Sequence, residues 1–318
     1  MAEIIQQDGT WTFDGDTVRI VPGRDKNVSP LRTTIGEIAV PLQALAGISF
    51  EPGRTSGRLR LRLRDGADPL LQVASGGLPD GVDPYRLTVE SDRTGVAEYL
   101  VDEVRNALLL DGVDPGPVDR YLLPGPALPI TVAAGDATVT FDGESIRLEW
   151  NWKTESAKSS GGPRTLALGQ VRGVEWRPNA GLENGSLRFL VAGAPPATPP
   201  KYDPNAVELW GFKKDPLMAL AGAAVLARLP HPRAGRTPDP AGTALAAGAT
   251  GTAGTAGTAG TAGTGGTAGT AEDAPAGGDD HDALLRRLRE LGELHQSGIL
   301  TAEEFTAAKQ AVLGRLQG

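Results

Sequence analysis

The residues best placed for chemistry are arginines that alternate with leucines along one short segment. The arginines are Arg58, Arg60, Arg62 and Arg64, and the leucines between them are Leu59, Leu61 and Leu63. This alternation predicts a half-buried antiparallel strand with all of the arginines on one face. A row of this kind, roughly 20 Å long, could contact lipid headgroups or an acidic peptide. The alternative is a solvated face that pairs across the sheet with acidic side chains.

Aromatic and basic residues form a second candidate group further along the chain. Its members are Trp150, Trp152, Trp210, Lys213 and Lys214. The two tryptophans at 150 and 152 alternate on a predicted strand. If these rings are buried, they pack a core or an inter-domain contact, whereas exposed rings would mark a contact surface. The two lysines could favour anionic groups.

The residues that usually carry catalysis are scarce. The chain has no cysteine, which excludes disulfides, thiolate catalysis and cysteine-ligated metal. Its three histidines, His231, His281 and His295, lie outside the segments that we expect to fold into cores. Asp14, Asp16, Asp142 and Glu144 flank Asp-Gly turns, where carboxylates serve the turn itself. We therefore expect no catalytic residue, metal, cofactor or small-molecule substrate. A carboxylate-dependent enzyme with its site between two domains is the less favoured alternative.

Composition and charge limit the class of partner. The formal net charge is −8 and no segment is strongly basic, which argues against nucleic-acid binding. The first residues lack the basic and apolar regions of a signal peptide. The longest apolar run, residues 217–229, is interrupted by Arg228 and is too short to span a bilayer. We expect a cytoplasmic protein.

The chain repeats itself in its first 232 residues. Residues 13–20 resemble residues 141–148, and residues 57–61 resemble residues 185–189. Asp83-Pro84 likewise matches Asp203-Pro204. Because the matched blocks keep their order, they predict a duplicated domain, with copies at residues 1–120 and 121–232.

Each copy reads as short strands followed by one helix. The first helix is expected near residues 96–110, with an apolar stripe that includes Leu100 and Val104. In the second copy Asp215 can cap a helix that begins with Pro216. Its expected stripe consists of Leu217, Leu220, Ala221, Ala224 and Val225. A helix with one apolar stripe can cover an open sheet face. We expect a mainly β protein with helices (α+β), made of two tandem pleckstrin-homology-like domains that are each closed by a C-terminal helix.

Two further segments complete the chain. Residues 233–279 are rich in Thr-Ala-Gly triplets and nearly free of large apolar side chains, which predicts a disordered linker. Residues 280–318 predict a helical hairpin with a stop at Gly298 and a capping box from Thr301 to Glu304. Its candidate oligomerisation residues are Leu284, Leu288, Leu291, Leu294, Ile299, Leu300 and Phe305. A hairpin this small rarely holds a core alone, so we expect it to pack on a copy of itself, on its own body or on a partner.

Residue patterns in both parts resemble known families. Residues 298–305, Gly-Ile-Leu-Thr-Ala-Glu-Glu-Phe, with Lys309 following, resemble the SHOCT (short C-terminal) domain. Residues 8–15, 149–153 and 209–216 resemble the bacterial domain of unknown function 4429, and the resemblance spans nearly all of residues 1–232. The second resemblance implies a pleckstrin-homology-like fold without an established activity. The first implies oligomerisation or docking.

These observations together predict a non-enzymatic protein-binding or scaffolding protein. Its partner would be itself, as a homo-oligomer, or another protein, and no nucleic acid is expected. The alternative is a peripheral membrane adaptor that binds anionic lipid through the basic strand residues.

Overall fold

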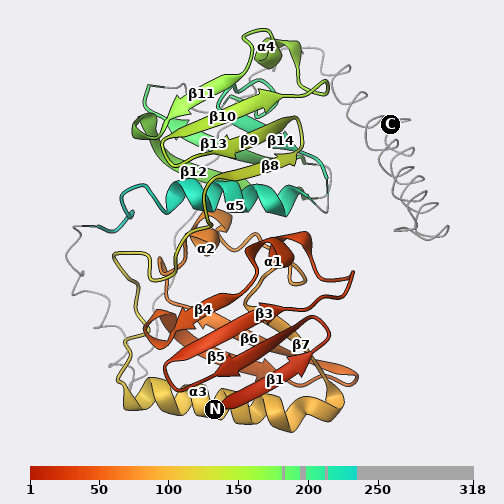
Figure 1. Cartoon of the computed structure of the whole chain (residues 1–318), viewed down its shortest axis with the longest axis vertical. Coiled ribbons are helices and arrows are strands. Elements are labelled where there is room, and N and C mark those ends of the chain that lie inside the picture. Colours follow the sequence, from red (N-terminus) through yellow and green to blue (C-terminus); the bar gives the residue numbers. More distant parts are fainter. Residues whose placement is uncertain (181–182, 194–197, 212–213, 235–318) are drawn as a thin grey trace, which may run out of the picture. The chain divides into compact units, whose positions relative to one another are not determined.

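The structure, a computed structural model, describes residues 1–180, 183–193, 198–211 and 214–234. The chain divides into one unit of residues 1–244 and another of residues 245–318. All elements labelled in Figure 1 belong to the first unit. The predicted linker lies outside the described residues except for its first two positions. The predicted hairpin, with every candidate oligomerisation residue, lies outside them entirely.

The first half of this unit forms two antiparallel sheets. Four strands pair in the order β1-β2-β3-β4, and three pair in the order β5-β6-β7. The strands are β1 (Ala2–Gln6), β2 (Gly9–Phe13), β3 (Thr17–Pro22), β4 (Ile38–Pro41), β5 (Leu45–Glu51), β6 (Ser56–Leu63) and β7 (Arg86–Glu90). The helices are α1 (Pro30–Ile35), η1 (Leu42–Ala44), α2 (Pro69–Ala74), η2 (Ser91–Arg93) and α3 (Thr94–Leu110).

The second half repeats the order of strands and sheets, but its described residues include no counterpart of α2 or η2. Its sheets are β11-β10-β9-β8 and β12-β13-β14. The strands are β8 (Ile130–Ala134), β9 (Ala137–Phe141), β10 (Ser145–Trp150), β11 (Arg164–Ala167), β12 (Val171–Arg177), β13 (Gly185–Val191) and β14 (Ala206–Leu209). The helices are α4 (Ser156–Ser159), η3 (Leu168–Gln170) and α5 (Asp215–Leu226). The described residues are thus mostly β-sheet with a few helices, as the sequence predicts.

The two Asp-Gly turns are built alike. Asp14 accepts hydrogen bonds from the backbone N–H groups of Asp16 (3.1 Å) and Thr17 (2.9 Å). Asp142 accepts them from Glu144 (2.8 Å) and Ser145 (2.7 Å). The glycine after each aspartate has a positive φ, 117° in Gly15 and 113° in Gly143, which a residue with a side chain rarely adopts. These carboxylates therefore serve the turns.

Helix α3 covers the first half as predicted, and it begins at Thr94. Ala97, Leu100, Val101 and Val104 form its buried face. This face packs on β1 and β5 (Figure 1). Val96, Ala107 and Leu108 flank this face and are partly buried against the same core, so α3 has the single apolar stripe of a surface helix.

Helix α5 differs from the prediction in two ways. Asp215 does not cap the helix, because Lys214 occupies the N-cap position and Asp215 is the first helical residue, 3% exposed. The expected single stripe is also wrong, since α5 is buried on nearly all sides from Asp215 to Leu226. One side packs on β8, β9 and β12, while another contacts α1 and α2 of the first half (Figure 1). A helix that is apolar all round is typical of such two-sided burial.

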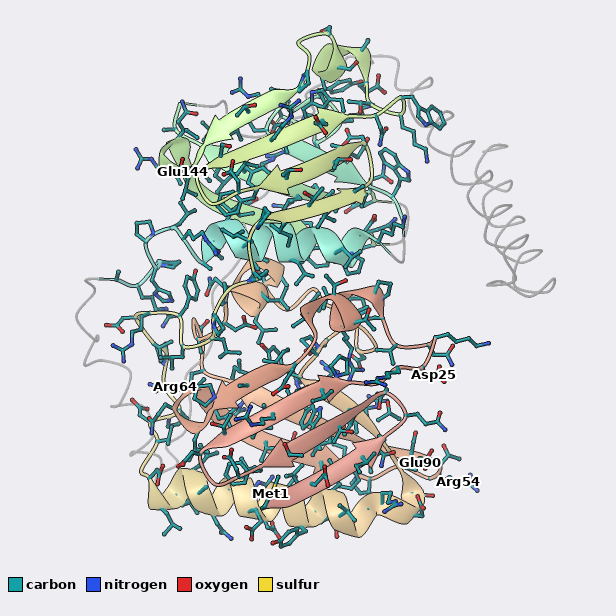
Figure 2. All side chains as sticks on the ribbon, in the orientation of Figure 1. Met1, Asp25, Arg54, Arg64, Glu90 and Glu144 are labelled. Carbon is teal, nitrogen blue, oxygen red and sulfur yellow. The ribbon has the colours of Figure 1, made fainter. Side chains whose placement is uncertain are left out.

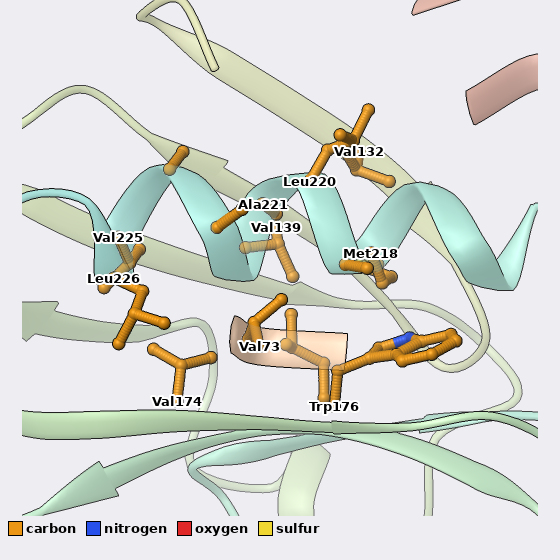
Figure 3. Close-up of a cluster of buried hydrophobic side chains, with 14 of the residues drawn as sticks. Val73, Val132, Val139, Val174, Trp176, Met218, Leu220, Ala221, Val225 and Leu226 are labelled. Atoms are coloured by element: carbon orange, nitrogen blue, oxygen red, sulfur yellow. The ribbon is translucent and has the colours of Figure 1, made fainter. Parts of the chain in front are cut away.

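The two halves share one hydrophobic core. Leu31, Leu70 and Val73 come from α1 and α2, and they belong to the same cluster as Trp176 and Met218 of the second half. Figure 3 shows Val73 among the side chains of α5 and β12. The contact is tight: a Cβ placed on Gly222 would lie 3.1 Å from Val73 Cγ2. The first half also has its own core, beneath α3.

The segment after α5 returns to the first half. The His231 ring lies edge-on to Tyr121, with 4.7 Å between ring centroids, and its Nε2 is 3.1 Å from the Gly66 carbonyl oxygen. Arg233 forms an ion pair with Asp65. His231 is thus engaged in packing that joins the two halves.

Candidate functional site

Strand β6 presents the predicted arginine row. Leu59, Leu61 and Leu63 are buried, and Arg58, Arg60 and Arg62 are exposed, in strict alternation. The row runs along the strand between Arg54 and Arg64, which are labelled on opposite sides of the first half in Figure 2. The predicted half-buried strand is therefore confirmed.

The four arginines have different surroundings. Arg64 is half-buried and holds two loops, because its Nε donates to Gly116 O (2.8 Å) and its Nη1 to Gln43 O (3.1 Å). Arg62 makes one long hydrogen bond, to Ala46 O at 3.4 Å. Arg58 is 3.9 Å from Asp80 in an exposed ion pair, a kind that contributes little. Among the described residues Arg60 has no hydrogen bond or ion pair.

Arg60 lies at the wall of a pocket with a volume of about 360 Å³. The pocket is lined by four arginines, three carboxylates and several hydroxyl groups. Its polar lining consists of Arg32, Arg58, Arg60, Arg86, Asp8, Glu51, Asp80, Ser49, Ser56 and Thr88. Strands β5, β6 and β7, the β1–β2 turn, helix α1 and the segment between α2 and β7 contribute these residues. The pocket therefore carries a net positive charge in a chain whose net charge is −8.

An ion pair between a buried arginine and a half-buried aspartate belongs to the lining of this pocket. Arg32 of α1 is 4% exposed, and its Nη1 lies 3.4 Å from Asp8 Oδ2. The same Asp8 oxygen accepts the Thr88 backbone N–H at 3.2 Å. This pair fixes the β1–β2 turn against β7 and α1, so it connects the two sheets of the first half.

The second half contains an equivalent ion pair. Lys158 of α4 donates to Asp136 Oδ2 at 2.5 Å, and Asp136 Oδ1 accepts the Glu208 backbone N–H at 2.9 Å. Both side chains are almost fully buried. Burial raises the pKa of Asp136, and its effect outweighs the opposing attraction of the Lys158 ammonium. Lys158 also donates to Pro200 O at 3.0 Å.

Neither pair was predicted from the sequence. Arg32 and Lys158 lie on short helices, α1 and α4, in segments between matched blocks where the two copies differ in length. The sequence does contain a clue to both residues. In each copy a basic residue lies on the connection from the third to the fourth strand. Asp8 and Asp136 likewise both precede the second strand of their copy.

The tryptophans have three different environments. Trp152 is 84% exposed. Trp150 is half-buried and donates from Nε1 to Gly162 O at 3.0 Å, while the Lys158 Nζ lies 4.7 Å from the centre of its ring. Trp210 is half-buried. Of the two predicted lysines, Lys214 is exposed and Lys213 lies outside the described residues.

Lys153, which was not among the predicted site residues, contacts two of these rings. Its Nζ lies 5.4 Å from the ring centre of Trp152 and 5.8 Å from that of Trp210. Both distances fit cation–π contacts. We call Trp152, Lys153 and Trp210 the tryptophan–lysine surface.

Buried titratable groups in the first half serve packing. Asp68 caps α2 by accepting the Leu70 N–H (2.9 Å), and it also accepts the Tyr85 hydroxyl (2.8 Å). Burial raises the pKa of both Asp68 and Tyr85. Within the described ranges no three His, Asp or Glu side chains gather as metal ligands would. In the same ranges every helix is too short or too polar to cross a bilayer.

Comparison with known families agrees with this architecture. The family model described as Domain of unknown function (DUF4429) matches residues 11–105 and 139–226, one segment in each half. The model described as Short C-terminal domain (SHOCT) matches residues 286–313. A search of curated proteins found no match.

Proposed function

We propose that this chain, which belongs to the family described as Domain of unknown function (DUF4429), is a non-enzymatic protein-binding and scaffolding protein. Each half has a four-stranded and a three-stranded antiparallel sheet followed by a helix, which supports a pleckstrin-homology-like fold. The absence of cysteine supports a cytoplasmic location.

The exposure of Trp152 is the observation that carries the proposal. A tryptophan side chain that is 84% exposed leaves a large apolar area in water, and burying that area against a partner is favourable. Lys153 lies between Trp152 and Trp210, so the surface combines apolar rings with a positive charge. Tryptophan is also among the residues that dominate binding energy in protein interfaces. This surface is therefore the proposed contact with a protein partner.

The C-terminal segment supplies the assembly half of the proposal. Residues 286–313 match the short C-terminal domain, and we assign oligomerisation or docking to them. Joining several copies raises the effective concentration of every tryptophan–lysine surface, so weak contacts gain avidity. A scaffold built in this way needs no reactive side chain.

Site-specific photo-cross-linking tests the contact surface. A photoreactive phenylalanine analogue at position 152 should give a discrete cross-linked product in the native host. The same analogue at position 99 is the matched control, because Tyr99 is also an exposed aromatic, 52% exposed, in the other half. Equal products at both positions, or none at position 152, would refute the contact.

A peripheral membrane adaptor is the second candidate. The exposed arginines of β6 favour it, since each basic residue near an anionic surface adds about 1 kcal/mol of binding. Co-sedimentation with anionic vesicles at low and moderate salt distinguishes the two functions. If binding is absent even at low salt, the adaptor function is wrong.

A further inference from the structure

The pocket beside β6 contains an uncompensated positive charge. Arg60 on β6 stands directly opposite Arg86 on β7, and like charges in this arrangement destabilise a sheet. Arg86 is compensated by Asp80 at 2.6 Å and by Asp83 at 3.1 Å. Arg60 has no such partner within the part of the chain that the structure describes, so its guanidinium lines the pocket without a carboxylate at ion-pair distance.

Arg32 contributes a further guanidinium to the lining of the same pocket. It lines the pocket and is 4% exposed. Its single ion pair, with Asp8, is 3.4 Å long. Its Nη2 is buried and has no hydrogen-bond partner among the described residues. Because the ion pair with Asp8 leaves this nitrogen unpaired, Arg32 retains hydrogen-bond donors at the pocket.

In the second half, the described cations at the two equivalent positions are both paired. Arg188 occupies the register of Arg60, opposite Glu175 on one side and Ala206 on the other. It forms an ion pair with Asp203 at 3.2 Å and a hydrogen bond to Thr198 O. Lys158, the counterpart of Arg32, is held by Asp136 and Pro200 O. Among the described residues of this corner, the arginine without an ion pair is therefore found in the first half.

We propose that this pocket of the first half binds a phosphomonoester. A phosphoryl group carries up to two negative charges and three acceptor oxygens, which suits the charge of Arg60 next to Arg86. Guanidinium groups bind such oxygens with strong, paired hydrogen bonds. The hydroxyls of Ser49, Ser56 and Thr88 supply further donors. The volume of about 360 Å³ lies within the roughly 300–1,000 Å³ of small-molecule sites.

Calorimetric titration of the full chain tests the site. The probes are inorganic phosphate, glycerol 3-phosphate, and phosphatidylcholine vesicles with and without phosphatidic acid. Wild type is expected to bind the free phosphates at constant ionic strength. Arg60→Gln should weaken this binding about ten-fold, the effect of losing one charged hydrogen bond. Arg62→Gln is the matched control, because Arg62 is exposed on the same face of the same strand but does not line this pocket.

A second variant gives Arg60 the acidic cross-strand neighbour that Arg188 has in the second half. Ser49 stands opposite Arg60, where Glu175 stands opposite Arg188. In Ser49→Glu the new carboxylate should pair with Arg60 and abolish phosphate binding, while the unfolding midpoint stays near that of wild type. This variant separates loss of the site from loss of the fold.

The outcomes decide both the site and the source of the phosphate. A soluble ligand is supported if wild type binds free phosphates, Arg60→Gln and Ser49→Glu reduce this binding, and Arg62→Gln retains it. Binding only to phosphatidic acid vesicles, with the same variant pattern, supports it with a lipid headgroup. If wild type binds no probe, or if Arg60→Gln and Arg62→Gln weaken binding equally, the proposal is overturned.

Discussion

Replacing Lys158 by methionine is expected to destabilise the second half strongly. Methionine approximates the length of lysine but carries no charge. Lys158 is 3% exposed and Asp136 is 1% exposed, and only 2.5 Å separates the ammonium from Asp136 Oδ2. The substitution therefore leaves a buried carboxylate without its counter-charge.

The expected cost is about 3 kcal/mol in the free energy of unfolding at neutral pH. Breaking a buried pair by removing one partner costs about 3–5 kcal/mol. We expect the lower end of this range, because Asp136 Oδ1 still accepts the hydrogen bond from the Glu208 backbone N–H at 2.9 Å. Removing Lys158 also removes the attraction that opposes the effect of burial, so the pKa of Asp136 rises further. A raised folded-state pKa means that stability is lost as the pH rises from 3.8 through the folded value. The cost should therefore shrink as the pH falls toward about 4.

Denaturant unfolding followed by circular dichroism measures this effect. Lys153→Met is the matched control, because it is the same substitution at an exposed site five residues earlier, and it should change stability by less than about 0.5 kcal/mol. In the double variant Asp136→Asn, Lys158→Met, most of the loss should be recovered. Equal, small effects of Lys158→Met and Lys153→Met would refute the reasoning.

Two further perturbations test the shared core and the turns. Val73→Ala, at a side chain 2% exposed, should cost about 2 kcal/mol and reduce amide-exchange protection in both α2 and α5; protection lost in α2 alone would show that the halves unfold separately. Hydrogen bonds from the backbone N–H groups of Ser145 and Glu144 lower the pKa of Asp142, so this group stabilises the fold above pH 3.8, and that stability is lost as the pH falls through the lowered value. Asp142→Asn should consequently give a flatter fall of the unfolding midpoint between about pH 5 and pH 2, and an unchanged acid profile would contradict this role.

Local patterns in the sequence predict several elements of the fold correctly. The alternation along residues 58–64 identified both faces of β6, because a strand places successive side chains on opposite sides. The stripe of residues 96–110 identified the buried face of α3 for the equivalent reason at helical spacing. The Asp-Gly turns follow from the conformation that glycine alone adopts easily.

Features that depend on distant contacts could not be obtained in this way. The all-round burial of α5 arises because α2 of the other half packs on it, and the sequence of α5 alone does not reveal that neighbour. The pairing of Arg32 with Asp8 depends on how α1 folds back over the β1–β2 turn. Whether Trp152 is buried or exposed was likewise undecided, since alternation places it on a face without saying what covers that face.

The assembly of copies through residues 280–318 is tested most directly by the mass in solution. Sedimentation equilibrium of the full chain should give a multiple of the monomer mass, and the chain that ends at residue 279 should give a monomer. Within the full chain, Leu291→Asp should also give a monomer. If the full chain and the shortened chain are both monomeric at high concentration, copies do not assemble through this segment.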